Sequence, residues 1–421
     1  MNEANEYDLI IVGAGMVGLA LALAVADKGR RVALLEQRPG QPSDWVQAID
    51  SRAADQFENR VSALNLASVQ LLNNLGAWPA IQDSGRACAY RDMHVWDGAG
   101  SGEIHFSADA LHEDCLGYIV ENAVIQAGLL RVLAEHADLQ LLTGVRVQAM
   151  SPAEPGQGRS LTLEDGRTLK ADLVVAADGA LSGMRRLGGI PATEWDYGHH
   201  ALVTTVQTEQ NHAETCWQCF TDDGPLALLP LADATPHRMS IVWSTLPAHG
   251  RELMALSDAA FRVALAQAFE QRLGAITGSL ERQLIPLRQR HAHRYVDQGF
   301  ALIGDAAHTI HPLAGQGVNL GFMDAAALAD VLLQAWSRGE SVAELTALRR
   351  YQRQRRSANL SMSATMEGFR RLFAPQPAPV RLLRSCGMNL MDRLEPVKQH
   401  LVLQAMGLSG ERPPLARREI T

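Results

Sequence analysis

The first 36 residues alternate between apolar runs and a glycine-rich turn. An apolar run at 7–12 is followed by the turn, by an Ala/Leu-rich stretch to Lys28 and by a second apolar run at 31–35. Short continuous apolar runs are typical of strands buried in a parallel sheet, and the stretch between them has the length of one helix. The pattern predicts a strand, a helix and a second strand.

Further apolar runs predict the elements up to about residue 180. In chain order they are a polar linker at 37–58, a helix from Arg60 to about Leu75, a strand hairpin at 90–106, a helix at 119–134, strands at 139–150 and 161–163, and a buried strand at 171–177 that ends in Asp178-Gly179. A linker this long inside a domain is usually functional or mobile.

The composition changes between residues 193 and 286. Short apolar segments at 201–206, 226–231 and 239–244 alternate with turns, and one helix is expected at 258–272. This pattern predicts an antiparallel sheet inserted into the first domain. A domain interrupted in this way has a pocket at the boundary, which is where small molecules usually bind.

A strand, a turn and a helix follow at 301–333. The strand ends in Gly304-Asp305, so one carboxylate lies at a strand end, where it can accept hydrogen bonds from a sugar-like polyol. The loop Pro312 to Gly317 has glycines where a flat ligand would need close backbone approach, and it opens a helix at 318–333. Alone, this stretch is also compatible with a plain strand-to-helix connection.

The tail at 342–405 is predicted to be helical. Its basic face at 349–356 is solvated or ion-paired, with an acidic partner or a membrane surface as the alternative. An apolar stripe on the same tail indicates core packing or, alternatively, the wall of a channel for a long apolar substrate. The stripe consists of Met362, Met366, Phe369, Leu372 and Phe373.

Composition narrows the class of protein. The 421 residues are 47% apolar and 20% charged, which is typical of a globular enzyme with a large core. The net charge of −8 argues against nucleic-acid binding. Five cysteines at irregular spacing favour a reducing compartment, and the Cys216-Cys219 pair is interpreted as structural.

The apolar run at 9–26 approaches the length of a membrane span. The flank before it is acidic, with Glu3 and Glu6, and glycines interrupt the run at nucleotide-loop spacing. We therefore expect a cytoplasmic protein without a transmembrane helix.

The interrupting glycines are Gly13, Gly15 and Gly18, a GxGxxG between the first strand and the first helix. Glu36 ends the second strand, 23 positions after Gly13. Strand, glycines, helix, strand and terminal acid together form the dinucleotide fingerprint, in which the helix start receives a pyrophosphate and the acid receives a ribose hydroxyl.

Together with the segment 178–185 and the Gly304-Asp305 stretch, this fingerprint resembles the single-component FAD-dependent aromatic hydroxylases of the p-hydroxybenzoate hydroxylase type. Within that group the chain is most similar to the ubiquinone-biosynthesis hydroxylases (UbiH/UbiF/UbiI). The segments that carry this likeness are 60–64, 75–78, 117–122 and 304–321. Three others, at 195–203, 321–326 and 404–408, favour the UbiI branch, which hydroxylates C5 of the ring in 2-polyprenylphenol. The alternatives are a sister ring-hydroxylation step of the same pathway, at C1 or C6, and hydroxylation of another aromatic.

The resemblance implies an α/β fold with three parts. A Rossmann-type FAD-binding domain comprises residues 1–78, 112–190 and 286–341. An inserted antiparallel β-sheet substrate domain comprises 79–111 and 191–285, and a C-terminal helical region covers 342–421.

The resemblance also implies the cofactor-binding residues. Gly13, Gly15 and Gly18, with Met16 and Val17 between them, hold the FAD pyrophosphate, and Glu36 and the adjacent Gln37 lie at the adenosine ribose. Arg60 and Gln126 contact the flavin side, and Val147 lies near the adenine. Asp178, Gly179 and Arg185 serve FAD and NAD(P)H, Asp305 binds the ribityl chain, and Pro312, Gly315, Gly317, Val318 and Asn319 line the isoalloxazine. The family commonly has Arg at the position of Gln126, and from the residues alone Arg60 is also compatible with a solvated arginine at a helix start.

By the same resemblance, NAD(P)H reduces the flavin, and O2 then gives a C4a-hydroperoxide whose distal oxygen the ring attacks. No catalytic residue and no metal site are predicted; His311 is a candidate base, with a structural histidine as the alternative. A flavin reductase and a redox-silent scaffold are the rival interpretations.

The implied partners are a polyprenylated phenol and a ubiquinone-biosynthesis complex or lipid-carrying protein. Peripheral contact with the inner membrane is a further expectation, and a homo-oligomer is left open.

Overall fold

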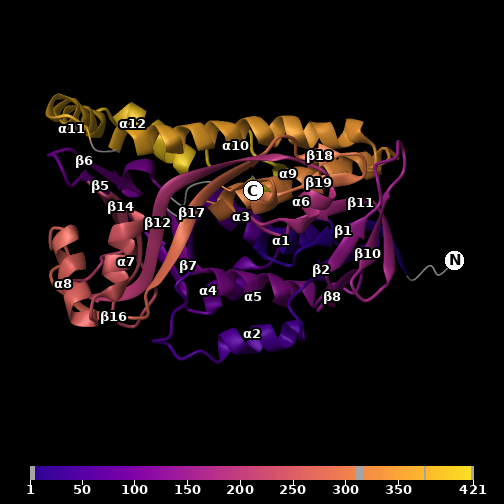
Figure 1. Ribbon diagram of the computed structural model, residues 1–421, viewed down its shortest axis with the longest axis horizontal. Helices are drawn as coiled ribbons and strands as arrows, with labels where there is room; N and C mark the ends of the chain where they lie inside the picture. Colours follow the sequence, from indigo (N-terminus) through magenta and orange to yellow (C-terminus); the bar gives the residue numbers. More distant parts are fainter. Residues whose placement is uncertain (1–4, 310–316, 374–375, 419–421) are drawn as a thin grey trace.

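The computed structural model describes residues 5–309, 317–373 and 376–418. It confirms the α/β class, with a parallel sheet, a larger antiparallel sheet and a helical tail (Figure 1). The long helix α10 (Leu345–Phe373) runs along one side of the molecule over both sheets. The limits of the three predicted domains stay a prediction.

The parallel sheet has the order β18-β19-β11-β1-β2-β8, in which the short edge strand β18 runs antiparallel to β19. Its strands are β1 (Glu6–Val12), β2 (Val32–Glu36), β8 (Leu139–Thr143), β11 (Thr168–Ala176), β18 (Val296–Asp297) and β19 (Phe300–Leu302), and the side strands β9 (Val147–Met150) and β10 (Arg159–Leu163) extend β11. Val12 lies beside Leu35 and Ala176, and Ala176 lies beside Leu302. The carboxyl ends of four strands therefore meet at one edge, which is where such sheets bind ligands.

Three helices pack on this sheet, namely α1 (Met16–Ala24), α5 (Asn122–Leu133) and α9 (Gly317–Ser337). Leu9, Ile10 and Ile11 of β1 are fully buried between them because both faces of a parallel sheet are covered. Among the described helices, α9 is long and apolar enough to cross a membrane, but 67% of its apolar window is buried inside the fold. Its apolar composition is therefore accounted for by core packing.

The second sheet has the order β20-β17-β12-β15-β14-β13-β5-β6, with β16 paired to β12. It contains β5 (Asp92–Asp97), β6 (Glu103–Ser107), β12 (Ala192–Thr208), β13 (Thr215–Thr221), β14 (Gly224–Pro230), β15 (Arg238–Thr245), β16 (Ile276–Ser279), β17 (Gln283–Ala292) and β20 (His308–Thr309). Its pairs are antiparallel except β13–β5, which confirms the predicted inserted sheet and the hairpin at 90–106. Helices α7 (Pro247–Ala255) and α8 (Asp258–Ala268) flank it.

Two predicted helices were wrong at their first turns. Residues 61–65 form strand β3 (Val61–Asn65) before helix α3 (Leu66–Asn74), and residues 117–121 form strand β7 (Gly117–Glu121) before α5. These strands pair with each other, and β7 also pairs with β4 (Ala87–Tyr90), so a short apolar run became a strand through partners distant in sequence.

The linker at 37–58 was also incompletely predicted, since it contains helix α2 (Pro42–Asp50), whose Trp45 is buried. The remaining short elements are α4 (Trp78–Asp83), α6 (Gly183–Leu187) and the 3-10 turns η2 (Asp109–Leu111), η3 (Gly304–Ala306) and η5 (Pro414–Ala416).

The tail is helical, as predicted, and consists of α10, α11 (Ala378–Arg393) and α12 (Glu395–Ala405). On the basic stretch of α10, Arg350 pairs with Glu340, whereas Arg349 and Arg353 are exposed. Contact of the exposed arginines with an acidic partner or a membrane surface stays a prediction. In the apolar stripe, the Phe373 ring stacks on Phe220 at a centroid distance of 3.6 Å. Leu372 is 45% exposed, so the stripe is only partly core, and the side chain of Phe369 lies outside the described part of the chain.

Candidate functional site

The glycine-rich turn lies between β1 and the start of α1, as predicted. Gly13 has φ +109°, and a Cβ there would lie 2.4 Å from the Ala177 carbonyl oxygen. A Cβ on Gly18 would lie 2.0 Å from the Gly13 carbonyl oxygen, so both positions require glycine for close backbone packing. Gly15 is different, because a Cβ on it would meet nothing within 4 Å.

Gly15 is the residue before α1, and no side chain caps that helix start. The N–H groups and the positive end of the helix dipole therefore face the open space in front of Gly15, beside Met16 and Val17. Gly13 and Gly18 thus pack against the backbone, whereas Gly15 leaves free space in front of the helix start. This arrangement fits a bound pyrophosphate.

Glu36 lies beside the same turn at the end of β2. Its carboxylate accepts hydrogen bonds from the backbone N–H of Ala14 (3.0 Å) and of Arg38 (2.8 Å). It therefore braces the glycine turn, and its oxygens retain lone pairs for a ribose hydroxyl. Gln37, the next residue, is exposed. Strand β8 pairs with β2 up to Glu36, and the backbone N–H of Val145 donates to the Glu36 carbonyl oxygen. Val147, which starts β9, follows two residues later.

Gln126 reaches the turn from α5. Its Nε2 donates to the Ala14 carbonyl oxygen at 2.7 Å. The structure thus brings Gln126 to the cofactor edge, as predicted, but its observed partner is the glycine turn itself. We assign it a positioning role there.

Asp178 and Gly179 follow β11 at the same edge. Asp178 accepts from the Ser182 hydroxyl (2.5 Å) and from the Met184 N–H (2.9 Å), so its carboxylate shapes the start of α6. Arg185 in α6 is buried and donates to the Ala306 carbonyl oxygen at 3.1 Å. The segment 178–185 is therefore tied directly to the turn that carries Asp305, and its contacts with FAD or NAD(P)H stay a prediction.

Asp305 lies in η3, at the end of β19. Solvent reaches its side chain, although protein surrounds it on most sides. Burial raises the pKa of Asp305, and the positive charges of His308 and Arg60 act against that rise. Arg60 stands directly before β3, is exposed, and lies close enough to Asp305 for its charge to lower the pKa of that carboxylate. Its contact with the flavin side of the cofactor stays a prediction.

A buried hydrogen-bond network that lies behind Asp305 was not predicted from the sequence. Asp324 of α9 accepts from the Gly304 N–H (3.1 Å) and from His308 Nε2 (2.5 Å) through one oxygen, and from Arg355 Nε (2.8 Å) and Asn359 Nδ2 (3.1 Å) through the other. Because a carboxylate can only accept, His308 Nε2 carries the proton. Burial alone would raise the pKa of Asp324, but His308 and Arg355 outweigh it and hold the pKa at about 2.

This network fixes the turn that carries Asp305 against α9 and α10. The available signal was an Asp in the middle of an otherwise Ala/Leu-rich apolar helix, a position where a charge must have a buried partner.

Asn319 has a structural role, and its predicted place beside the isoalloxazine stays a prediction. It is buried, its Oδ1 accepts from the Asn65 N–H (3.1 Å), and its Nδ2 donates to the Ala63 carbonyl oxygen (2.8 Å). It therefore fastens β3 to the start of α9. Gly317 and Val318 precede it at the helix start, whereas Pro312, Gly315 and His311 lie outside the described residues.

Three other features lie away from this edge. A cavity of about 1010 Å³ is lined by α2, α4, β4 and residues 231–236, and it shares no residue with the predicted FAD site. The Cys216-Cys219 pair is buried and unbridged, and burial raises the pKa of the Cys219 thiol to about 12, which makes it unreactive.

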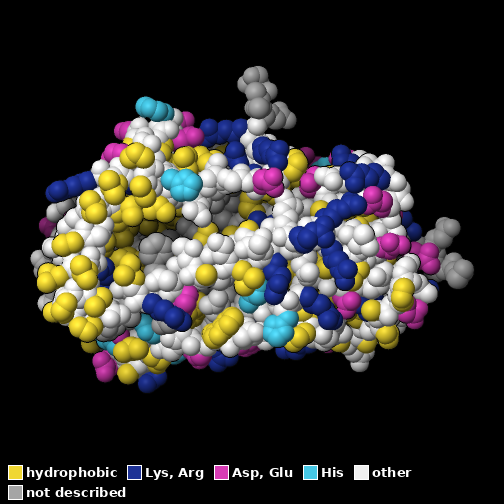
Figure 2. All heavy atoms as spheres, turned by 90° about the horizontal axis from the view of Figure 1, so that it is seen from above, with side chains coloured by type: hydrophobic (Ala, Val, Ile, Leu, Met, Phe, Trp, Pro, Cys, Tyr) yellow, Lys and Arg dark blue, Asp and Glu magenta, His cyan; other side chains and the backbone are white. Residues whose placement is uncertain are grey.

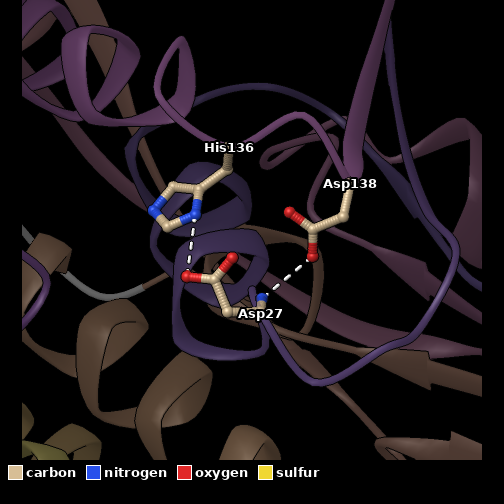
Figure 3. A group of neighbouring side chains, drawn as sticks. All are labelled: Asp27, His136 and Asp138. Atoms are coloured by element: carbon tan, nitrogen blue, oxygen red, sulfur yellow. Dashed lines mark hydrogen bonds and ion pairs between the residues drawn. The ribbon is translucent and has the colours of Figure 1, made fainter.

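The third feature is a group formed by Asp27, His136 and Asp138 beyond the other end of α1 (Figure 3). The Asp27 N–H donates to Asp138 (2.9 Å), and His136 Nδ1 lies 3.1 Å from an Asp27 oxygen. These contacts hold together the two turns at Asp27 and at 136–138 and explain why the three side chains lie close. We assign no metal to this group.

Comparison with known proteins agrees with this geometry. The FAD binding domain family matches residues 6–364. The 3-demethoxyubiquinol 3-hydroxylase of Escherichia coli K12 is 39% identical over 407 residues, covering 97% of this chain and 100% of that protein. The mitochondrial ubiquinone biosynthesis monooxygenase COQ6 of Xenopus tropicalis is 34% identical, covering 94% of this chain and 92% of its own.

Among solved structures, p-nitrophenol 4-monooxygenase PnpA from Pseudomonas putida superposes with a TM-score of 0.76. It is 20% identical and covers 96% of this chain and 98% of its own, a likeness that shows the fold.

Proposed function

The chain belongs to the FAD binding domain family and, within it, to the ubiquinone-biosynthesis hydroxylases, and we propose that its substrate is the ring of a polyprenylated phenol or quinol. It is an FAD-dependent monooxygenase that hydroxylates a ring in ubiquinone biosynthesis. The observation that carries this conclusion is the end-to-end alignment with a named ubiquinol hydroxylase, together with a cofactor edge whose glycines fit a pyrophosphate.

When bound, FAD supplies the oxygen-transfer chemistry with NAD(P)H and O2, and the chain binds, orients and shields it. In this proposal the α1 start receives the pyrophosphate, Glu36 the ribose and Asp305 the ribityl chain. Asp324 and Arg185 hold the Asp305 turn from behind, and Gln126 and Glu36 hold the glycine turn. A single dinucleotide fingerprint supports transient binding of NAD(P)H on the same domain.

Two ring positions are candidates. The identity with the E. coli protein favours a step like the one in its name, the hydroxylation of a demethoxylated quinol. Hydroxylation at C5 of a 2-polyprenylphenol, expected from the motifs at 195–203 and 321–326, is the second candidate.

Deleting the gene in its host and identifying accumulated precursors by mass spectrometry separates these candidates. A precursor that lacks one methoxy group of the final quinol but carries the other would support the first position. A polyprenylphenol without any methoxy group would support C5. Complementation with wild type should restore the quinone, whereas Asp305→Ala should not. An unchanged quinone pool in the deletion strain would reject the function in this host.

We further propose that the protein meets its substrate at the inner membrane or through a lipid-carrying partner. The support is chemical, because a polyprenyl chain partitions into the bilayer and the ring must leave it, at least in part, to reach a flavin. Recovery of active protein together with other enzymes of the pathway would support a complex.

A further inference from the structure

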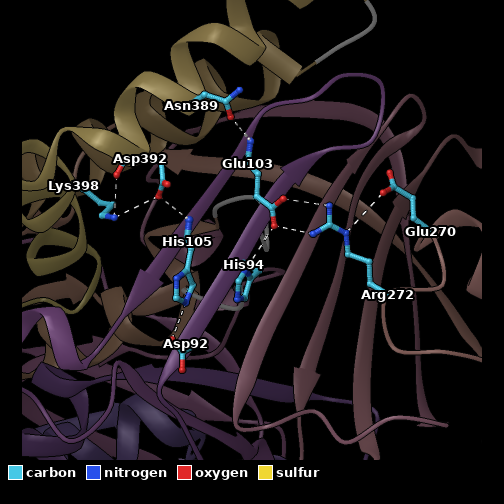
Figure 4. Close-up of polar contacts among 9 residues, drawn as sticks. All are labelled: Asp92, His94, Glu103, His105, Glu270, Arg272, Asn389, Asp392 and Lys398. Atoms are coloured by element: carbon cyan, nitrogen blue, oxygen red, sulfur yellow. Dashed lines mark hydrogen bonds and ion pairs between the residues drawn. The ribbon is translucent and has the colours of Figure 1, made fainter.

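Helix α11 is attached to the body of the protein through polar side chains. It lies along β6, the edge strand of the antiparallel sheet, where Asn389 and Asp392 accept from two N–H groups of that strand (Figure 4), and a third side chain of α11 accepts from the turn before it. The contacts join Ser101 N to Ser385 Oγ (3.3 Å), Glu103 N to Asn389 Oδ1 (3.0 Å) and His105 N to Asp392 Oδ1 (3.1 Å). The residues of α11 that face the protein are therefore largely its hydrophilic ones.

A buried ion pair strengthens the attachment. Arg384 of α11 donates to both oxygens of Asp97 (2.8 and 2.7 Å), and its guanidinium lies over the Phe373 ring. Both charged side chains are almost fully buried. A two-pronged pair of this kind fixes the rotation of α11 about its axis, so the direction of its outer face is determined.

The outer face of α11 and α12 is apolar, the reverse of an ordinary surface helix. Leu382, Leu383 and Leu390 are 67, 73 and 58% exposed. Leu394, Val397 and Leu401 continue the stripe through α12 with spacings of three and four residues. We call these six residues the tail face. Large exposed apolar patches mark interaction sites because water contact with them is unfavourable.

The helical tail that carries the tail face is basic. Residues 345–405 contain eleven Arg and Lys against three Asp and Glu, in a chain whose net charge is −8. Exposed Arg349 and Arg353 lie in the first turns of α10, about 30 Å or more along that helix from its end next to α11. Figure 2 shows Lys and Arg along the length of this side of the molecule and apolar side chains around a hollow at the α11–α12 end.

From these observations we infer that the tail face docks on a lipid bilayer that contains anionic lipid. Leucines projecting from two helices insert at the headgroup boundary, and the arginines of α10 attract anionic headgroups. A second copy of the chain is a poorer occupant, because a twofold contact would bring two basic segments together. The inference rests on the proposed function in one respect: a polyprenylated substrate gives the protein a reason to bind a bilayer.

The test is flotation of the full-length, FAD-loaded protein with phosphatidylcholine vesicles, with and without phosphatidylglycerol. Wild type should float with the anionic vesicles. The double variant Leu383→Ser/Leu390→Ser should lower the partition coefficient by about tenfold per leucine, because each leucine loses its burial in lipid. Val263→Ser is the matched control, since Val263 is 57% exposed but lies on α8, and it should float like wild type.

A second variant tests the charge. Arg349→Gln/Arg353→Gln should weaken binding to anionic vesicles by about fivefold per arginine, and the loss should shrink at high salt. Bound-flavin absorbance and circular dichroism equal to wild type show that each variant is folded, which is expected because the substituted side chains are exposed.

Wild type that stays at the bottom of the gradient with both vesicles would overturn the inference, as would a leucine variant that floats like wild type. A leucine variant that converts a dimer to a monomer without changing flotation would assign the tail face to a second copy instead. Flotation requires no turnover, so its failure is distinguishable from an unchanged quinone pool, which would reject the proposed function alone.

Discussion

The buried carboxylate of Asp324 gives the sharpest test of how the flavin edge is held. In Asp324→Asn the side chain keeps its shape and loses its charge. One oxygen can still accept from Arg355, but the new NH2 group would face the Gly304 N–H and the protonated His308 Nε2, which are both donors. Arg355, which is only 7% exposed, would lose its counter-charge.

The structure sets the size of the effect. The pKa of Asp324 falls from 3.8 to about 2, which corresponds to roughly 2 to 3 kcal/mol of stability at neutral pH. Removing one partner of a buried pair also leaves the other charge uncompensated, so the expected loss in the free energy of unfolding is about 3 to 5 kcal/mol. The Asp305 turn should loosen as well, raising the FAD dissociation constant about tenfold for one lost hydrogen bond.

Urea unfolding followed by tryptophan fluorescence measures the first quantity, and flavin fluorescence titration measures the second. Asp330→Asn is the matched control, because Asp330 lies on the same helix and is partly exposed. It should stay within about 0.5 kcal/mol of wild type. If Asp324→Asn is as stable as Asp330→Asn, the network does not hold the turn and the reasoning is wrong.

The pH dependence has a defined sign. The folded pKa of Asp324 lies below the unfolded value, so its stabilisation is fully present above the unfolded pKa and is lost as pH falls from about 4 to about 2. Wild type should therefore lose more stability across this window than Asp324→Asn, which has no carboxyl group to protonate.

Three further predictions follow from other contacts. Gly18→Ala places a Cβ against the Gly13 carbonyl oxygen and should raise the FAD dissociation constant by about 100-fold, measured by the same titration, whereas FAD affinity equal to wild type would remove the reason given for this glycine. Arg384→Met leaves Asp97 buried without its partner and should cost about 3 to 5 kcal/mol in urea unfolding; an unchanged midpoint would show that the pair contributes little. Among the five thiols only Cys386 is exposed, so a thiol reagent should modify one group rapidly in the native protein and five after denaturation, and two or more fast groups would contradict the burial of the others.

The sequence predicted best where a local pattern decides the structure. The βαβ unit, the terminal Glu36 and the Gly304-Asp305 turn each depend on a few neighbouring residues, and all were found at the same edge of the parallel sheet. Prediction failed where distant pairing decides. Residues 61–65 became a strand because 117–121 lie beside them, and Asp324 is stabilised by His308 and by a helix whose place no local pattern specifies. The backbone partners of Asn319 on β3 could not be known without the fold.

The bonds between α11 and β6 also have a consequence for biosynthesis. Glu103 and Asn389 are 286 positions apart, so the edge strand is made long before the helix that satisfies its N–H groups. During translation the unpaired edge of β6 is open to pairing with other chains, which is the usual route to aggregation. Truncation before Ala378 should leave that edge uncovered permanently. The last helices therefore protect the finished sheet from pairing with other chains.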